Sequence, residues 1–292
     1  MLHSHNHSHS NTTPTSDGST AKLSLAIVIN LMLTVAQVVG GLLSGSLSLV
    51  ADALHNLSDA GAILVAVVAR SIGQKAASEQ MTYGYKRAEI IGVLINSTML
   101  IVVGIYLVYE AVIKYFNPTP IDGWIVFILA GLALVIDLAT ALLTYQAGAK
   151  DNMNIRAAFI HNLSDAMASV AVMVAGVLII NYQLYIVDVL ATLLISAYVI
   201  YHGVMLLKKC ILIIMQAVPT GIDLAELKKA LEAIDEVDEI FHMHVWQMDE
   251  TRLFFEGHAK LNSEQSLQAK EKIRAVLLDD FNISHSTIET NR

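Results

Sequence analysis

The sequence predicts an α-helical membrane protein that ends in a small α+β domain. Hydrophobic residues make up 55% of the 292 residues and charged residues only 15%, whereas soluble domains usually carry about 25% charged residues. Six apolar runs are each long enough for the ~20 residues that a membrane span needs. After the sixth run the pattern changes to shorter helical and strand-like segments. We therefore divide the chain into a His-rich tail (1–21), a six-helix membrane domain (22–210) and a C-terminal domain (211–292).

The N-terminal tail is rich in Ser, Thr, Asn and His, a composition typical of disorder. Its histidines alternate with Ser and Asn at His3, His5, His7 and His9. Such a run can bind metal weakly, and it is equally compatible with a solvated tail that has no role. The start lacks the basic and then apolar pattern of a cleavable signal peptide.

The charges between the six predicted spans indicate an orientation. The spans cover residues 22–43, 47–71, 87–113, 122–147, 155–180 and 184–208. Basic residues gather around the loops after the second and fourth spans, namely Arg70, Lys75, Lys86, Arg87, Lys150 and Arg156. The opposite side has only Lys114. Because cytoplasmic loops are enriched in Lys and Arg, we expect both termini in the cytoplasm.

The C-terminal domain has a different pattern and most of the charge. Helical spacing predicts helices over 222–235 and 264–281, and alternation predicts strands over 237–247, 251–261 and 283–289. This α-β-β-α-β order fits an α+β sandwich with helices on one face of a sheet. From Ala217 onward the net charge is −7, out of −8 for the whole chain. An acidic domain argues against a nucleic-acid partner and suits a cation ligand.

A repeated motif places ionisable residues inside two spans. His55 and Asp59 stand four residues apart in the second span, and His161 and Asp165 repeat that spacing in the fifth. Both pairs belong to the same six-residue sequence, His-Asn-Leu-Ser-Asp-Ala. Residues four apart lie on one face of a helix, and ionisable residues are expensive at membrane depth. The repeat therefore indicates a functional site between two membrane helices.

Two imidazoles and two carboxylates can supply the four ligands of a tetrahedral metal site. Such a mixed set suits Zn²⁺, Co²⁺ or Cd²⁺ better than Mg²⁺ or Ca²⁺. Imidazole titrates near neutral pH when unperturbed, so the site could exchange metal for protons. A lone buried histidine is usually structural, but two His/Asp pairs at identical spacing favour a metal site.

Asp52, Asp137 and His202 are three further ionisable candidates within the predicted spans. Asp52 shares a helical face with His55 and either steers a ligand or is a polar residue near the membrane edge. Asp137 in the fourth span either lines the metal or proton path or pairs with a polar neighbour. His202 in the sixth span has no carboxylate at matching spacing, and we interpret it as structural.

A second candidate metal site lies in the C-terminal domain. His242, His258 and His285 fall on three predicted strands, which one sheet could bring together, with Glu289 as a carboxylate partner. His244 shares a strand face with His242. The alternative is a set of ordinary exposed histidines. As ligands they would bind regulatory Zn²⁺, offset the repulsion between two acidic domains and tighten a dimer.

The sequence favours a transporter over other functions. It has no G-x-x-x-x-G-K-[ST] nucleotide-binding loop, so export would draw on an ion gradient, and proton exchange is the simplest coupling. The first alternative is a membrane metal sensor or receptor that binds without transport. The second is an intramembrane metalloenzyme, which is disfavoured because the chain lacks H-E-x-x-H. We therefore predict no enzymatic activity.

These features resemble the cation diffusion facilitator family, the zinc-efflux transporters, over nearly the full length of the chain. The resemblance rests on the two His-x-x-x-Asp pairs, on Tyr83-Gly-Tyr-Lys-Arg-Ala-Glu89, on Asn154-Ile-Arg-Ala-Ala-Phe159 and on His244-Val-Trp246. It implies six transmembrane helices, a cytoplasmic ferredoxin-like domain, a homodimer and metal–proton antiport. It also implies that the His/Asp quartet is the transport site, with Zn²⁺ as the transported substrate.

The chain departs from the family pattern at three places. Some members carry another metal site between spans two and three, but the positions around Met81 and Tyr85 offer no ligands, so we predict its absence. Asn291 stands where the family usually has an acidic residue, which leaves open the fourth ligand of the C-terminal site. The loop between spans four and five lacks the long His-rich insertion of many organellar members. This favours a bacterial-type exporter in the inner (plasma) membrane.

Overall fold

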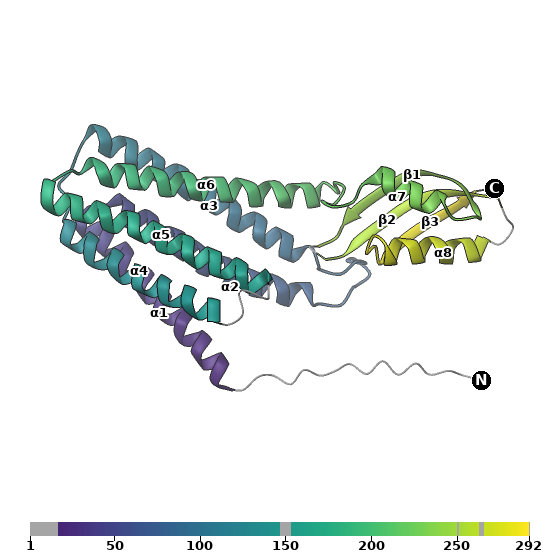
Figure 1. Ribbon diagram of the computed structural model, residues 1–292, viewed down its shortest axis with the longest axis horizontal. Coiled ribbons are helices and arrows are strands. Elements are labelled where there is room, and N and C mark those ends of the chain that lie inside the picture. The colour runs from purple at the N-terminus through teal and green to yellow at the C-terminus, as the bar shows by residue number, and fades with distance from the viewer. Residues whose placement is uncertain (1–16, 147–152, 250, 263–265, 292) are drawn as a thin grey trace. The chain divides into compact units, whose positions relative to one another are not determined.

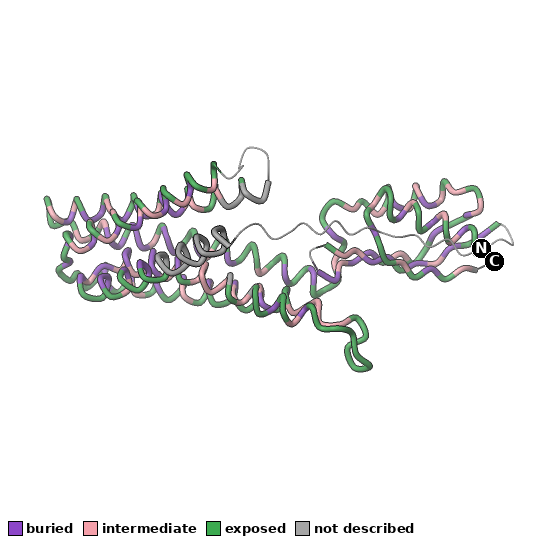
Figure 2. Tube along the Cα trace, turned by 90° about the horizontal axis from the view of Figure 1, so that it is seen from below, coloured by how far each residue is buried: buried purple, intermediate pink, exposed green. Residues whose placement is uncertain are grey.

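The computed structural model of the chain describes residues 17–146, 153–249, 251–262 and 266–291 (Figure 1). The chain divides into two compact units. The first is formed by Met1–Ala60 and Thr119–Ala191, and the second by Gly61–Pro118 and Thr192–Arg292. In both units, buried and exposed residues alternate along the helices, as expected for helices that each present one face to a neighbour (Figure 2).

Six long helices contain the apolar runs. They are α1 (Asp17–Ser44), α2 (Leu47–Gly73), α3 (Ala88–Phe116), α4 (Gly123–Gln146), α5 (Met153–Tyr182) and α6 (Ile186–Ile214). Within the described residues, five of these helices are long and apolar enough to cross a membrane, and α1 adds the apolar stretch Leu31–Ser44. The predicted helical membrane protein is confirmed, and each helix lies close to its predicted run.

Two predicted boundaries differ from the observed helices. α1 begins at Asp17, before the predicted start at residue 22, and residues 1–16 of the predicted tail lie outside the described residues. α6 continues to Ile214 because the apolar residues after Lys209 extend the helix, so the predicted boundary at residue 210 falls inside it. The division into 1–21, 22–210 and 211–292 stays a prediction.

In the first unit, α4 and α5 pack along each other (Figure 1). A Cβ on Gly176 of α5 would lie 2.9 Å from the backbone nitrogen of Phe127 on α4, so glycine is required where the two helices approach. The buried stripe of α4 consists mostly of small residues, namely Gly123, Val126, Ala130, Ala133, Asp137 and Ala141. This close packing positions α5, which carries His161 and Asp165.

A buried carboxylate ties the start of α2 to the start of α6. Asp188 accepts hydrogen bonds from the hydroxyls of Ser46 and Ser48, both at 2.6 Å, and all three residues are buried. It also accepts the backbone N–H groups of Leu47 and Ser48, at 3.0 and 3.1 Å. N–H groups in the first turn of a helix have no acceptor within that helix. Asp188 therefore caps α2 from another helix.

The C-terminal part of the second unit is a three-stranded sheet with two helices. Its elements are α7 (Leu224–Glu232), β1 (Val237–Gln247), β2 (Leu253–Leu261), α8 (Ser266–Asp279) and β3 (His285–Asn291). The strand order is β1-β2-β3, with β1 antiparallel and β3 parallel to β2. The predicted α-β-β-α-β order and the α+β fold class are confirmed.

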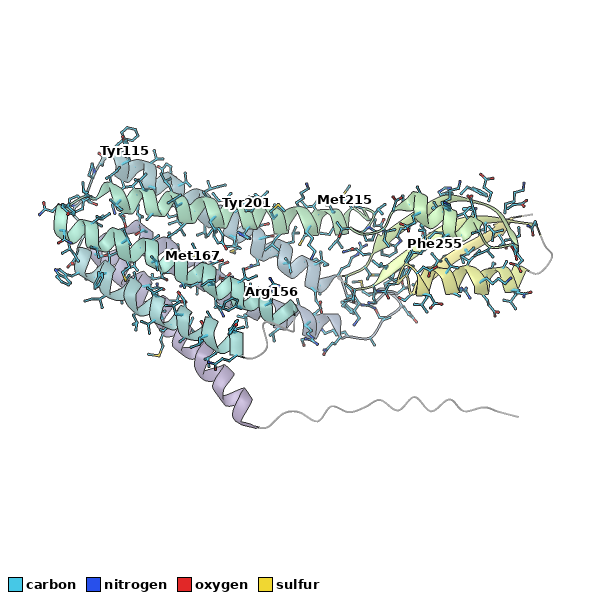
Figure 3. The ribbon with its side chains drawn as sticks, in the orientation of Figure 1. Tyr115, Arg156, Met167, Tyr201, Met215 and Phe255 are labelled. Carbon is cyan, nitrogen blue, oxygen red and sulfur yellow. The ribbon has the colours of Figure 1, made fainter. Side chains whose placement is uncertain are left out.

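Both helices cover the same face of this sheet. Leu227 and Leu231 of α7 and Ile273 of α8 pack in one core with Ile240 and Phe255 of the strands, and Figure 3 labels Phe255 in this domain. Because side chains alternate across a strand, the neighbours of these residues point to the opposite face. That face carries the predicted metal-binding histidines.

Asp249, which follows β1, is bound to the residues that lead into β2. The Asp249 carboxylate accepts the backbone N–H groups of Thr251 and Arg252, at 3.0 and 2.9 Å, and binds the Arg252 guanidinium through Nε and Nη2. Burial raises the pKa of Asp249, but these hydrogen bonds outweigh burial and hold the pKa below its ordinary value. The turn is thereby fixed by a charge-assisted network.

Candidate metal centre

The four ligands predicted in the membrane spans come together between α2 and α5. His55 Nε2 lies 3.3 Å from Asp165 Oδ1 and 3.7 Å from Asp59 Oδ2. His161 Nε2 lies 3.4 Å from Asp59 Oδ2 and 3.5 Å from Asp165 Oδ2. Each imidazole thus contacts the carboxylate of its own helix and that of the other helix. The four side chains form a closed ring, in which Asp165 joins the two imidazoles through its two oxygens and Asp59 joins them through Oδ2 alone.

The four members of this ring, which we call the quartet, differ in exposure. The side chains of His55 and Asp165 are 10% and 11% exposed, whereas those of Asp59 and His161 are 32% and 47% exposed. Ligand atoms of His55, Asp59 and Asp165 all lie within 4.8 Å of one another, and His161 completes the ring from the more open side. The quartet is therefore open toward His161 and closed toward His55.

A hydrogen-bonded chain supports the closed side. Asp52 lies one turn before His55 and is buried, and Gln37 of α1 donates its side-chain N–H to Asp52 Oδ2 at 2.7 Å. Asn56 Nδ2 donates to Gln37 Oε1 at 3.4 Å. The burial of Asp52 and its bond to Gln37 agree with a supporting role beside His55, and the alternative of a polar residue near the membrane edge stays a prediction. Sequence reasoning missed Gln37 and Asn56, although amides inside apolar spans are a usable signal.

Asp137 and His202, the other two candidates named in the spans, have neighbours of their own. Ser169 of α5 donates its hydroxyl to Asp137 Oδ2 at 3.0 Å, and both residues are buried. This is the polar neighbour that one of the two predictions for Asp137 required. His202 is exposed and packs against the rings of Tyr198 and Tyr201, with centroids 4.4 and 5.6 Å away. The structural role of His202 stays a prediction.

The open face of the C-terminal sheet gathers some of the predicted histidines. The rings of His242 and His258 stack with centroids 5.2 Å apart, and His244 lies 4.9 Å from His242. His258 Nδ1 is buried without a hydrogen bond and lies 3.8 Å from Glu289 Oε2. His242 has a φ of 52°, where a non-glycine backbone is strained, at an irregularity in the β1–β2 register. This group is a candidate second metal site.

His285 does not join this group within one chain. In the parallel β2–β3 register Phe254 pairs with His285, whereas His258 pairs with Glu289, four residues farther along β3. At about 3.3 Å per residue, four residues span roughly 13 Å. The His285 ring instead packs on Phe254, with centroids 4.6 Å apart. The sequence placed His285 on the correct strand but could not fix the register of that strand.

Comparison with known proteins identifies the family. A family model described as "Cation efflux transmembrane domain" matches residues 23–215. The chain belongs to the cation diffusion facilitator family. Its members form a family of transporters, not a class of enzymes, so the chain is a membrane-spanning cation-efflux protein. The resemblance found in the sequence is confirmed.

Several relatives cover most of the chain. The "Cadmium, cobalt and zinc/H(+)-K(+) antiporter" of Bacillus subtilis (strain 168) is 30% identical over 259 residues, which cover 87% of this chain and 83% of that protein. "Zinc transporter ZitB" of Yersinia pestis is 32% identical over 278 residues, which cover 94% and 88%. Among solved structures, the metal-bound C-terminal domain of the CzcD transporter from Cupriavidus metallidurans matches with a TM-score of 0.23 and 23% identity. The match covers 24% of this chain and 100% of the solved domain.

Proposed function

We propose that this family member exports Zn²⁺ from the cytoplasm in exchange for protons, and that the quartet is its transport site. Cd²⁺ and Co²⁺ are the alternative substrates. The observation that carries the proposal is the closed ring, with four nitrogen–oxygen distances between 3.3 and 3.7 Å. With ligands ~2.0–2.2 Å from Zn²⁺, the edges of a tetrahedron measure about 3.3–3.6 Å. The four nitrogen–oxygen contacts are therefore close to such edges, although they use both oxygens of Asp165. Single ligand atoms of His55, Asp59 and Asp165 already lie within 4.8 Å of one another, and His161 would close in on the ion from the open side.

Proton coupling is supported by the chemistry of the ligands. Zn²⁺ binds neutral imidazole and ionised carboxylate, so an arriving ion displaces any protons held on these groups. Returning protons would in turn weaken the hold on the metal and favour its release. The name of the Bacillus subtilis relative includes H(+), which agrees with this exchange. Without thiolate ligands, the site releases the ion more readily than an all-cysteine site would.

The setting of this exchange is also part of the proposal. We place the chain in the inner (plasma) membrane with both termini cytoplasmic, because basic residues flank the loops after α2 and α4. We also propose that it works as a homodimer. Export then means that the quartet receives the ion from the side that carries the C-terminal domain.

A flux experiment tests this function. The full chain is reconstituted in proteoliposomes, and uptake of Zn²⁺, Cd²⁺, Co²⁺ and Mg²⁺ is followed across an imposed pH gradient. We expect Zn²⁺ flux that rises with the gradient and stops when an ionophore collapses it, and no Mg²⁺ flux. Zinc binding without flux would instead indicate the metal sensor. Zinc flux that does not depend on the pH gradient would contradict proton coupling but not the assignment of the transport site.

The C-terminal histidines are proposed as a regulatory zinc site. Two acidic domains repel each other, and Zn²⁺ bound by His242, His258 and Glu289 would offset that repulsion. We expect Zn²⁺ to shift the full chain in detergent toward the dimer, as measured by mass photometry. His258→Ala should raise the zinc concentration needed for half of this shift at least about tenfold. Loss of a group that only supports a metal ligand already changes metal affinity 10–100-fold.

His285→Ala is the matched control, since His285 lies away from the His258 group. We expect it to leave the zinc-dependent dimer shift unchanged. If both substitutions weaken the shift equally, the three predicted histidines act together. In that case His285 would have to reach the His258 group of the other chain in the dimer. If neither does, the regulatory site is wrong even where transport is intact.

A further inference from the structure

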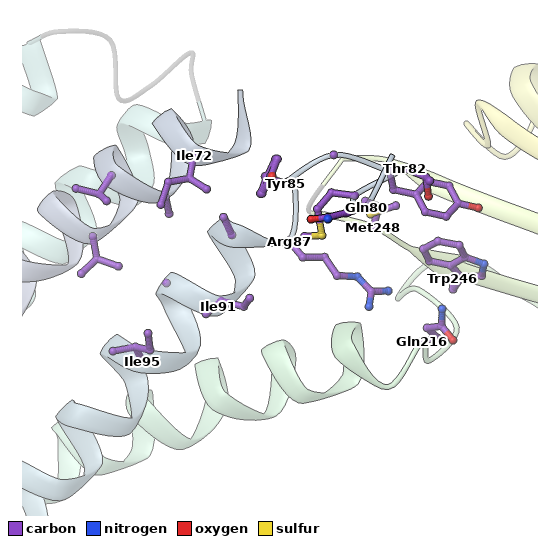
Figure 4. A pocket seen from close by; sticks show the side chains of 18 of the residues that line it. Ile72, Gln80, Thr82, Tyr85, Arg87, Ile91, Ile95, Gln216, Trp246 and Met248 are labelled. Atoms are coloured by element: carbon purple, nitrogen blue, oxygen red, sulfur yellow. The ribbon is translucent and has the colours of Figure 1, made fainter. Parts of the chain in front are cut away.

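A cavity of about 930 Å³ lies in the second unit, where α2 ends and α3 begins (Figure 4). It is lined by α2 from Leu64 to Ile72, the connection from Gln80 to Tyr85, the start of α3, and a few residues beyond α6 and on the sheet. The volume is near the upper end of the ~300–1,000 Å³ that is usual for ligand sites. None of its lining residues belongs to the quartet or to the His258 group, so metal transport does not explain it.

The helical wall of this cavity is apolar and continuous with exposed surface. Leu64, Val68 and Ile72 follow one face of α2 at four-residue spacing, and Ile91 and Ile95 do the same on α3. Leu64 remains 65% exposed, and Ile91 and Ile95 about half exposed. Because α2 and α3 are long and apolar enough to span a membrane, these exposed apolar side chains are open to contact with hydrocarbon. An occupant of this wall is therefore expected to be a hydrocarbon chain.

The space between α2 and α3 ends at Gly92, where the two helices come into contact. A Cβ at this position would lie 2.9 Å from Val65 Cγ1 and 3.2 Å from Ala69 Cβ, so α3 touches α2 there. Both of those α2 residues and Gly92 line the cavity. The cavity thus has a closed floor of small side chains, and its apolar wall leads out to the lipid-exposed faces of the helices. This geometry suits an acyl chain that enters laterally from the bilayer.

The other end of the cavity carries one positive and one negative charge. Arg87 directly precedes α3, and its guanidinium carbon lies 5.7 Å from the Trp246 ring centroid. Glu256 of β2 lines the same cavity. Over the described ranges of the chain, neither side chain forms an ion pair. Tyr83 and Trp246 add amphipathic rings of the kind found at the membrane–water boundary.

We propose that this cavity binds a membrane phospholipid with a zwitterionic primary-amine headgroup, namely phosphatidylethanolamine. The Arg87 guanidinium binds the phosphate, which matches its fork of N–H donors. The Glu256 carboxylate accepts hydrogen bonds from the ammonium group. A phosphatidylglycerol headgroup carries no cation for Glu256, and the quaternary ammonium of phosphatidylcholine has no N–H to donate. The lipid would thus connect α2 and α3 to the sheet of the same unit.

Fluorescence quenching can test this site in the full chain. The chain has two tryptophans, Trp124 and Trp246, so Trp124→Phe leaves the cavity residue as the only reporter. This variant is placed in phosphatidylcholine nanodiscs that contain increasing fractions of lipid brominated on its acyl chains. We expect brominated phosphatidylethanolamine to quench Trp246 saturably, at a lower fraction than brominated phosphatidylglycerol or phosphatidylcholine.

Two charge variants and one control sharpen the result. Arg87→Gln should lower the maximum quenching by every brominated phospholipid, because it removes the charge-assisted bond to the phosphate that they share. Glu256→Gln should abolish only the preference for phosphatidylethanolamine, and Lys260→Gln, which changes a charge on β2 outside the cavity lining, should do neither. Quenching that rises linearly with every lipid would overturn the proposal as bulk contact. Quenching that appears only when dilution yields monomers would show that a second copy fills the cavity.

Discussion

Asp59→Asn and Asp165→Asn should each lower zinc flux by about a hundredfold or more. Each carboxylate contacts both imidazoles of the quartet, so each substitution removes one of four ligands and one of the two negative charges that balance the ion. Loss of an outer-shell partner alone changes metal affinity 10–100-fold, and loss of a ligand should cost more. Zinc uptake by proteoliposomes, with reconstituted protein quantified on gels, measures the effect.

Asp122→Asn is the matched control for these two variants. Asp122 is exposed and accepts the backbone N–H groups of Trp124 and Ile125 at the start of α4, at 3.0 and 3.3 Å. Asparagine caps helices as well as aspartate does, so the control loses a charge without losing a structural role. We expect its flux to equal that of the unchanged chain. Wild-type flux in either quartet variant would place the transport site elsewhere.

The convergence of the quartet could be predicted because it depends on local rules alone. A His/Asp pair at four-residue spacing shares a helical face wherever the helix begins. The same pair in two apolar spans then needs only one helix contact to form the ring between His55, Asp59, His161 and Asp165. Helix ends shifted by several residues from their predicted positions, as at Asp17, leave this argument untouched.

The rest of the site depends on contacts that no local pattern encodes. Gln37 reaches Asp52 only because α1 and α2 meet at one particular rotation, and a single amide does not reveal which carboxylate it binds. The position of His285 depends on strand register, since a parallel strand can slide along its partner without changing its own alternation. No local pattern marks Asp188, because its donors lie about 140 residues earlier in the chain.

Asp188→Ala should destabilise the protein by about 3 kcal/mol or more. The substitution leaves two buried hydroxyls and two backbone N–H groups without their acceptor, and each unsatisfied buried group costs roughly 1–3 kcal/mol. The hydroxyls of Ser46 and Ser48 already lie 3.2 Å apart and can bond to each other, so the two N–H groups account for most of the loss. The apparent melting temperature in detergent should fall by roughly 5–10 °C.

Two further substitutions distinguish the buried cap formed by Asp188 from an ordinary exposed helix cap. Asp122→Ala removes an exposed cap and should cost only about 1 kcal/mol, because water replaces the lost acceptor. Asp188→Asn keeps one acceptor oxygen but turns an amide N–H₂ toward donors, so its melting temperature should lie between those of the unchanged chain and Asp188→Ala. If Asp188→Ala melts no lower than Asp122→Ala, the carboxylate does not hold α2 to α6. In that case the position of His55 and Asp59 along α2 must depend on the packing of the helix alone.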